Sequence, residues 1–156
     1  MTFKKTNGET IESLENYILN YFNEHENVYL YIGTDSQRKK KKYTYITTIC
    51  FRQPCNGVHV IYKKHTFERN VIPNLYIKLW KEVELTVEVL NHLVTFLDKS
   101  KITVDLDYNV LKEYSSNIVH DSAKGWVAAL GVNVRSKPNA WAASYAADHL
   151  THTNND

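Results

Sequence analysis

The feature that most constrains the fold is a change in the spacing of apolar residues near residue 73. Before it, segments 28–34, 43–51 and 58–67 have the two-residue alternation or the continuous apolar character of strands. After it, residues 73–98 place apolar side chains every three or four positions, as a long amphipathic helix does. This order predicts three antiparallel strands followed by a helix that packs on them.

The rest of the chain alternates between the two periodicities. A helix is predicted before the first strand, at 9–25, and the segments after residue 98 are predicted as a strand (101–107), a helix (116–130), a strand (132–136) and a last helix (138–150). We find no repeat and no linker, so residues 1–156 are predicted to form one domain with a core over 28–150. The expected fold is α/β: a mixed five-stranded sheet, three antiparallel strands followed by βαβ units, with helices on both faces and an extra N-terminal helix.

Composition leaves the partners open. No apolar run approaches the ~20 residues of a membrane span, and the N-terminus is not that of a signal peptide, so we expect a cytoplasmic protein with no membrane partner. The two cysteines, Cys50 and Cys55, lack zinc-site spacing and are expected to be free thiols. A net charge of +2 is too small to establish a nucleic-acid partner, and nothing indicates an oligomeric state.

Five consecutive basic residues lie between the first two predicted strands: Arg38, Lys39, Lys40, Lys41 and Lys42. Two interpretations are open, a solvated hairpin tip and a loop that contacts phosphates. The preceding Ser36 and Gln37 have the same ambiguity, since they suit either a local turn or contacts to a nucleic-acid backbone.

Two acidic residues lie at strand ends. Asp35 ends the first predicted strand and Asp107 the fourth, each on the alternation opposite the apolar residues of its strand. Carboxylates gathered there would repel one another, and a divalent cation such as Mg²⁺ would remove that penalty. Asp105 shares the alternation of Asp107 and is a rival ligand. We favour Asp107 because loops open a site at a strand end.

Acidic residues on helices are harder to assign. Glu82 and Glu84 flank the apolar stripe of residues 73–98 at about 100° on either side of Val83, and helical geometry alone does not choose between them. Asp148 shares a face of the last predicted helix with Trp141 and Ser144. It is either capping, ion-paired or metal-bound.

Three motifs resemble the bacterial YkuK family of predicted ribonuclease H-related nucleases, and the resemblance covers nearly the whole chain. They are Gly33-Thr34-Asp35-Ser36-Gln37, Lys81-Glu82-Val83-Glu84-Leu85, and the stretch Lys137–Ala143 with Ala147–Leu150. The resemblance implies a ribonuclease H-like fold in which Asp35, Glu84, Asp107 and Asp148 bind two Mg²⁺ or Mn²⁺ ions. Glu84-Leu85 resembles the Glu-Leu pair that opens the long helix of that superfamily, which favours Glu84 over Glu82.

The function implied by the resemblance is hydrolysis of phosphodiester bonds in RNA, DNA or an RNA/DNA hybrid by a two-metal mechanism. Lys39 to Lys42, with Ser36 and Gln37, would contact the nucleic acid. One alternative is a non-catalytic nucleic-acid-binding or regulatory domain, and another is a different phosphoryl-transfer enzyme with the same metal cluster. The chain lacks a phosphate-binding G-x-x-x-x-G-K-[ST] loop and a G-x-S-x-G element, which disfavours an ATPase and a serine hydrolase.

Overall fold

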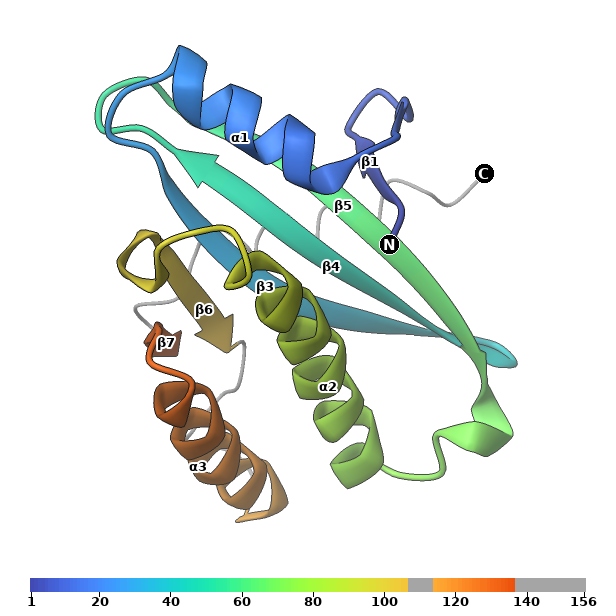
Figure 1. Ribbon diagram of the computed structural model, residues 1–156. Coiled ribbons are helices and arrows are strands. Elements are labelled where there is room, and N and C mark those ends of the chain that lie inside the picture. Colours follow the sequence, from blue (N-terminus) through green and yellow to red (C-terminus); the bar gives the residue numbers. More distant parts are fainter. Residues whose placement is uncertain (107–113, 137–156) are drawn as a thin grey trace.

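A computed structural model describes residues 1–106 and 114–136. Its strands and helices are β1 (Phe3–Lys5), β2 (Thr10–Ile11), α1 (Leu14–Glu24), β3 (Tyr29–Lys39), β4 (Lys42–Arg52), β5 (Val58–Glu68), α2 (Leu75–Leu93), β6 (Ile102–Leu106), α3 (Tyr114–Ala129) and β7 (Asn133–Ser136), with 3-10 turns at Arg69–Val71 and Lys99–Lys101. These strands form one mixed sheet in the order β2-β1-β5-β4-β3-β6-β7 (Figure 1). The predicted α/β class is confirmed.

The antiparallel meander and the crossover that follows it match the predicted order. Strands β3, β4 and β5 pair antiparallel along their whole lengths. Strand β6 then pairs with β3 in parallel, with Leu30 opposite Ile102, and β7 pairs with β6 in parallel. Strand β3 therefore lies inside the sheet, between the meander and the parallel strands.

The five-stranded sheet predicted from the sequence is wrong, because the described residues form seven strands. The two additional strands come from the N-terminus: β1 pairs with β5 and β2 pairs with β1. Phe3 and Ile11 are buried in the core from these strands. Ile11 fits a helical repeat equally well, so the predicted helix at 9–25 was too long. The helix begins at Leu14, where the Ser13 side chain accepts a hydrogen bond from the Asn16 N–H.

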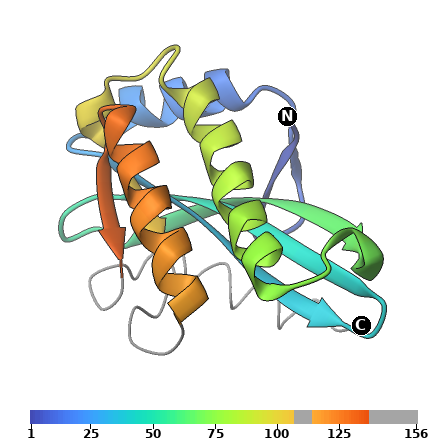
Figure 2. The same cartoon turned by 90° about the horizontal axis from the view of Figure 1, so that it is seen from below.

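The three described helices cover one face of the sheet (Figure 2). Helix α2 packs on β3 and, with fewer contacts, on β4, and α3 lies beside α2 over β6 and β7. The helix predicted at 138–150 lies outside the described residues, so helices on both faces of the sheet stay a prediction. In the part of the chain that the structure describes, none of the helices has the length and hydropathy needed to cross a membrane.

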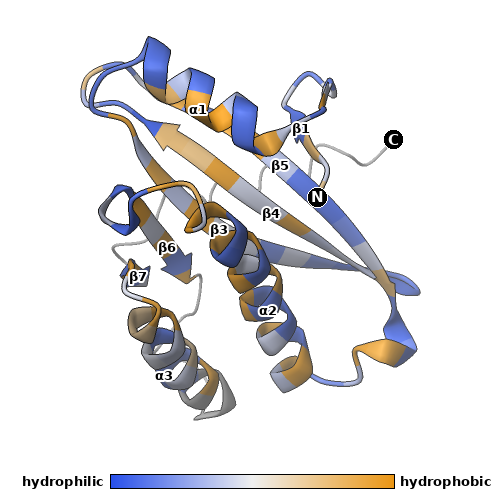
Figure 3. Ribbon diagram, in the orientation of Figure 1, coloured by the Kyte–Doolittle hydropathy of each residue, from blue (hydrophilic) through white to orange (hydrophobic). Residues whose placement is uncertain are grey.

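Apolar residues of the sheet and helices form the core, and polar residues dominate the far end of the β3–β4 hairpin (Figure 3). Leu30 and Ile32 of β3 are completely buried, as are Val83 and Leu90 of α2 and Ile18 of α1. Burial of one such side chain contributes about 1.5–3 kcal/mol. This packing fixes the height of α2 above β3, on which the site described below depends.

Helix α2 is shorter than the predicted 73–98. It begins after Asn74, whose side-chain oxygen accepts a hydrogen bond from the Ile77 N–H at 2.9 Å, and it ends at Leu93. We expect Asn74→Ala to lower the free energy of unfolding by about 1 kcal/mol, because the capping bond is lost. Chemical denaturation measures this loss. Asn91→Ala, at an exposed position inside the same helix, is the matched control and should cost nothing. An equal loss in both variants would contradict the capping role.

Candidate functional site

The site is built on the second half of β3, where polar residues replace apolar ones. Thr34 and Ser36 point toward α2, since they bond to Thr86 and Glu82 of that helix. Asp35 lies between them and follows the opposite alternation. Its Oδ1 accepts a hydrogen bond of 2.8 Å from the Ser36 backbone N–H. Ser36 thus contacts an acidic residue through its backbone and another through its side chain.

Glu82 is the acidic residue that α2 places over β3. Its side chain is only 5% exposed. The Ser36 hydroxyl donates to Glu82 Oε1 at 2.5 Å, and Lys78 Nζ lies 3.3 Å from the same oxygen. Lys78 precedes Glu82 by one helical turn, so both side chains leave α2 on the same side. The Glu82 carboxyl is therefore buried with one hydroxyl and one ammonium group as partners.

Burial, with a smaller contribution from the nearby Asp35 carboxylate, raises the pKa of the Glu82 carboxyl to about 7. The Lys78 ammonium and the Ser36 hydroxyl group act in the opposite direction, and they do not fully compensate for the lost hydration. The Glu82 carboxyl of α2 and the Asp35 carboxyl of β3 therefore lie within electrostatic range of each other. Added positive charge at this place would stabilise both.

Tyr45 closes the site on the β4 side. It pairs opposite Ser36 in the sheet, and its hydroxyl group donates a long hydrogen bond of 3.5 Å to the Lys78 carbonyl oxygen. Its ring is completely buried. Burial, and then the Glu82 carboxylate, raises the pKa of the Tyr45 phenol above its usual range. Tyr45 thus remains a neutral donor that shields Glu82 from water.

A row of buried threonine hydroxyls fixes α2 against the sheet. Thr47 and Thr34 bond across β4 and β3 at 2.9 Å, and Thr34 and Thr86 bond between sheet and helix at 2.7 Å. The Thr86 hydroxyl group also lies 2.9 Å from the Glu82 carbonyl oxygen. The Thr86 hydroxyl group is the donor to both Thr34 and the Glu82 carbonyl oxygen, which share its one proton, and the Thr34 hydroxyl group can in turn donate to Thr47. The row links the Glu82 backbone to β3.

The structure brings Glu82, and not Glu84, next to Asp35. The Glu84 side chain is 63% exposed and pairs with Lys81 at 3.1 Å. Both acids flank Val83, but only the Glu82 side of the helix faces the sheet. The sequence analysis favoured Glu84 on the resemblance and did not single out Lys78 or the threonines. A signal was present, because Lys78, Glu82 and Thr86 repeat every four residues and form one polar row.

Asp105 is held by a different partner. Both of its carboxylate oxygens accept hydrogen bonds of 2.9 Å from the Arg135 guanidinium group, and the Asp105 side chain is fully buried. The guanidinium carbon lies 4.2 Å from the centre of the Tyr31 ring. This arrangement fits the interpretation of Asp105 as an ion-pair partner.

The other predicted ligands, Asp107 and Asp148, lie outside the described residues and stay predictions. Asp35 and Glu82 are thus the members of the acidic site that the structure shows together. Among residues 1–106 and 114–136, no group of three or more His, Cys, Asp or Glu side chains is arranged to hold a metal ion. Any metal site of this family type therefore needs acidic residues from outside those ranges.

The predicted basic loop is the end of the β3–β4 hairpin. Lys39 pairs opposite Lys42, and Lys40 and Lys41 form the exposed turn. Lys42 forms an ion pair with Glu68 at 3.2 Å. The hairpin continues β3 beyond Asp35, so these lysines lie roughly 13 Å or more along the strand from the acidic site. Their contact with phosphates, like that of Ser36 and Gln37, stays a prediction.

We expect Glu82 to make stability depend on pH in the absence of divalent metal. The native pKa of about 7 exceeds the ordinary 4.5, so the native state binds the proton more tightly. The contribution of protonated Glu82 to the free energy of unfolding is fully present below pH 4.5 and is lost as the pH rises through 7. Glu82→Gln removes the effect. In EDTA, the stability of Glu82→Gln relative to wild type should rise by about 3 kcal/mol between pH 4.5 and 8. Urea denaturation at several pH values measures this; a constant difference would contradict it.

We expect Arg135→Met to lower the free energy of unfolding by about 3 kcal/mol, because the buried Asp105 carboxylate loses its partner. Arg38→Met is the control, since it makes the same chemical change at an exposed position, and it should change stability by less than about 0.5 kcal/mol. Thermal and urea denaturation measure both variants. Equal effects would show that Asp105 does not depend on Arg135.

Comparison with known protein families gives one match. The family model described as ribonuclease H-like matches residues 9–152, which is most of the chain and includes α1 and all residues of the acidic site. No curated protein matched the chain.

Proposed function

We propose a function that starts from one fact: the chain belongs to the ribonuclease H-like family. The proposed function is that of a divalent-metal-dependent nuclease, which hydrolyses phosphodiester bonds in RNA, DNA or an RNA/DNA hybrid. The finer assignment to the YkuK type is part of the proposal and rests on the motifs around Asp35, Glu82 and residues 137–150.

One observation carries the proposal: a carboxyl from β3 and a carboxyl from α2 lie on either side of Ser36. Carboxylate oxygens are the ligands that Mg²⁺ and Mn²⁺ prefer, and Mg²⁺ needs only one or two from the protein. We propose that Asp35 and Glu82 hold such ions, with Asp107 and Asp148 as further ligands for a pair. When bound, two ions supply the electrostatic stabilisation that phosphodiester hydrolysis requires.

The chain's own residues have separate tasks in this proposal. Ser36 positions the Glu82 carboxyl through its hydroxyl and the Asp35 carboxyl through its N–H. Tyr45 and the threonine row exclude water below Glu82 and hold α2 in place. Lys39 to Lys42 lie on the continuation of the same strand, where cationic side chains can hold a nucleic-acid backbone without reading its sequence.

One observation favours the alternative, a non-catalytic nucleic-acid-binding domain. Lys78 already pairs with Glu82, so the buried carboxylate has a cation without any metal. In a nuclease the divalent ion must displace Lys78 or bind the other carboxylate oxygen. In a binding domain the ion pair is permanent. Metal binding therefore separates the two functions more directly than nucleic-acid binding does.

We expect wild-type protein to bind Mn²⁺ in a calorimetric titration and, with Mn²⁺, to cleave at least one member of a panel of RNA, DNA, hybrid and junction substrates. Asp35→Asn and Glu82→Gln should each lower cleavage by at least about 100-fold, because a carboxylate ligand is lost. Glu84→Gln, a matched change on the exposed side of α2, should stay within about twofold of wild type.

Two results would contradict the proposal. Absence of Mn²⁺ binding at millimolar metal would favour the non-catalytic alternative. Cleavage that Asp35→Asn leaves at the wild-type level would indicate a contaminating nuclease. A large loss in Glu84→Gln with none in Glu82→Gln would reverse the assignment of the helical ligand.

A further inference from the structure

A pocket of ≈ 470 Å³ lies at the edge of the sheet where β1 runs beside β5. It is lined by Thr2, Lys4, Tyr62, Lys63, Lys64 and Thr66, and we call it the β1–β5 pocket. Its volume lies in the range of sites for small ligands or ligand groups. Three of the six lining residues are lysines, so the pocket is suited to an anion.

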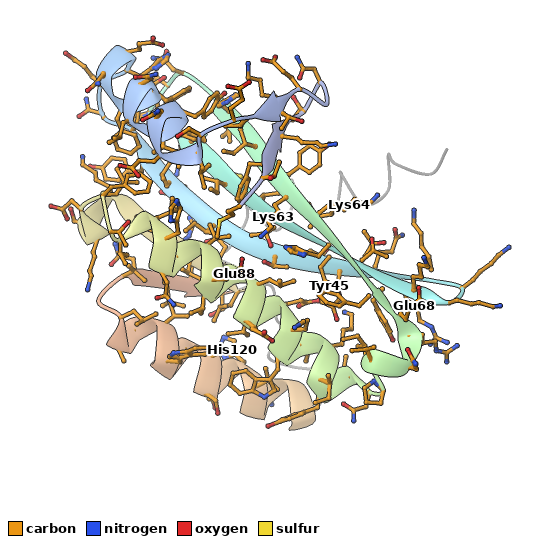
Figure 4. All side chains as sticks on the ribbon, turned by 45° about the vertical axis from the view of Figure 1, so that its right-hand side comes forward. Tyr45, Lys63, Lys64, Glu68, Glu88 and His120 are labelled. Carbon is orange, nitrogen blue, oxygen red and sulfur yellow. The ribbon has the colours of Figure 1, made fainter. Side chains whose placement is uncertain are left out.

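The three lysines are not equivalent. Lys63 points toward α2 and forms an ion pair with Glu88 at 3.1 Å, whereas Lys64 leaves β5 on the other side (Figure 4). Lys4 and Lys64 are exposed, and within the described ranges neither has a carboxylate at ion-pair distance. Among the described residues, the pocket therefore presents two ammonium groups without a carboxylate partner, together with the hydroxyl groups of Thr2 and Thr66. Phosphate oxygens are well matched to such donors.

The register of the sheet relates this pocket to the acidic site. Asp35 pairs opposite Ile46, and Ile46 pairs opposite Lys64. Residues directly opposite each other share a face of the sheet, so Asp35 and Lys64 leave it on the same face. Lys4 pairs opposite Tyr62, two residues before Lys64, and it shares this face as well. Neighbouring strands are about 4.8 Å apart, which places Lys64 roughly 10 Å from Asp35 along one cross-strand row.

We propose that the β1–β5 pocket binds a backbone phosphate of the nucleic acid whose scissile bond lies at Asp35. The inference rests on the proposed function and adds a second point of contact to it. A separation of roughly 10 Å corresponds to the rise of about three nucleotides along the axis of a duplex, at 3.4 Å per nucleotide of each strand. Lys4 and Lys64 neutralise that phosphate, and Thr2 and Thr66 donate hydrogen bonds to it. A contact to the phosphate backbone carries no sequence information, so the proposed contact is independent of sequence.

The test is equilibrium binding of a fluorescein-labelled 16-nucleotide RNA, alone and as a hybrid with DNA, in EDTA at several salt concentrations. Lys4→Ala/Lys64→Ala should weaken binding and make the plot of log K against log[salt] shallower by about 0.7 to 0.9, the value for one lost phosphate contact. The control is Lys99→Ala/Lys124→Ala, which removes the same charge from exposed lysines outside the pocket. It should leave the slope within error of wild type.

A second measurement uses wild-type protein and does not depend on the folding of a variant. Lysine acetylation, read by mass spectrometry, should slow at Lys4 and Lys64 when the RNA is bound, and not at Lys99 and Lys124. Inorganic phosphate serves as a separate probe. Protection by inorganic phosphate without protection by the RNA would overturn the assignment to nucleic acid.

The proposal is also overturned if both double variants change the slope equally, or if wild-type protein binds neither form of the RNA. Because no divalent metal is present, these results do not depend on catalysis. Failure of the nuclease proposal is measured separately, by Mn²⁺ binding and by cleavage in Asp35→Asn. A protein that binds RNA through the pocket but cleaves nothing is therefore distinguishable from one that lacks the pocket contact.

Discussion

The packing of α2 on β3 is the constraint on which the acidic site depends, because it matches two repeats of nearly equal length. Four residues of helix advance about 6 Å, and two residues of strand advance about 6.6 Å. Successive turns of α2 therefore meet alternate residues of β3. Thr86 meets Thr34, and one turn earlier Glu82 meets Ser36. The site is a continuation of the core in which polar pairs replace the apolar contacts of Leu30 and Ile32.

This geometry carries an energetic consequence for Glu82. A carboxylate in that row loses its hydration, and a hydroxyl group and a single ammonium group restore only part of the lost stabilisation, which is why the pKa of Glu82 is raised. Replacement by an apolar residue would be better for stability alone. A carboxyl group that is costly to bury is more simply explained by a site that needs its charge. The same reasoning does not extend to Asp105, whose two oxygens are fully matched by Arg135.

The order of the long elements could be predicted from the sequence because each has a clear period. The prediction that Asp35 ends the first strand was wrong, because β3 continues to Lys39 and pairs with β4 over that length. The short strands β1 and β2 could not, since three and two residues carry no period and depend on pairing with β5. Helical periodicity alone could not show whether Glu82 or Glu84 faces the sheet, because the two residues lie symmetrically on either side of Val83. Only the position of the sheet breaks that symmetry. The Arg135 partner of Asp105 depends in the same way on the pairing of β6 with β7.

The distribution of ion pairs explains how a chain of net charge +2 can have separate basic patches on its surface. Acidic side chains pair with Lys5, Lys42, Lys63, Lys78 and Lys81. Lys4 and Lys64 stay outside these pairs although they are sequence neighbours of paired lysines, because strand alternation directs them to the opposite face. The net charge of the whole chain therefore underestimates the positive charge that a polyanion meets on the face of the sheet that carries Asp35. Lys63, Lys78 and Lys81, which carboxylates neutralise, lie toward the helices. Lys4 and Lys64, which have no such partner among the described residues, lie on the same face of the sheet as Asp35.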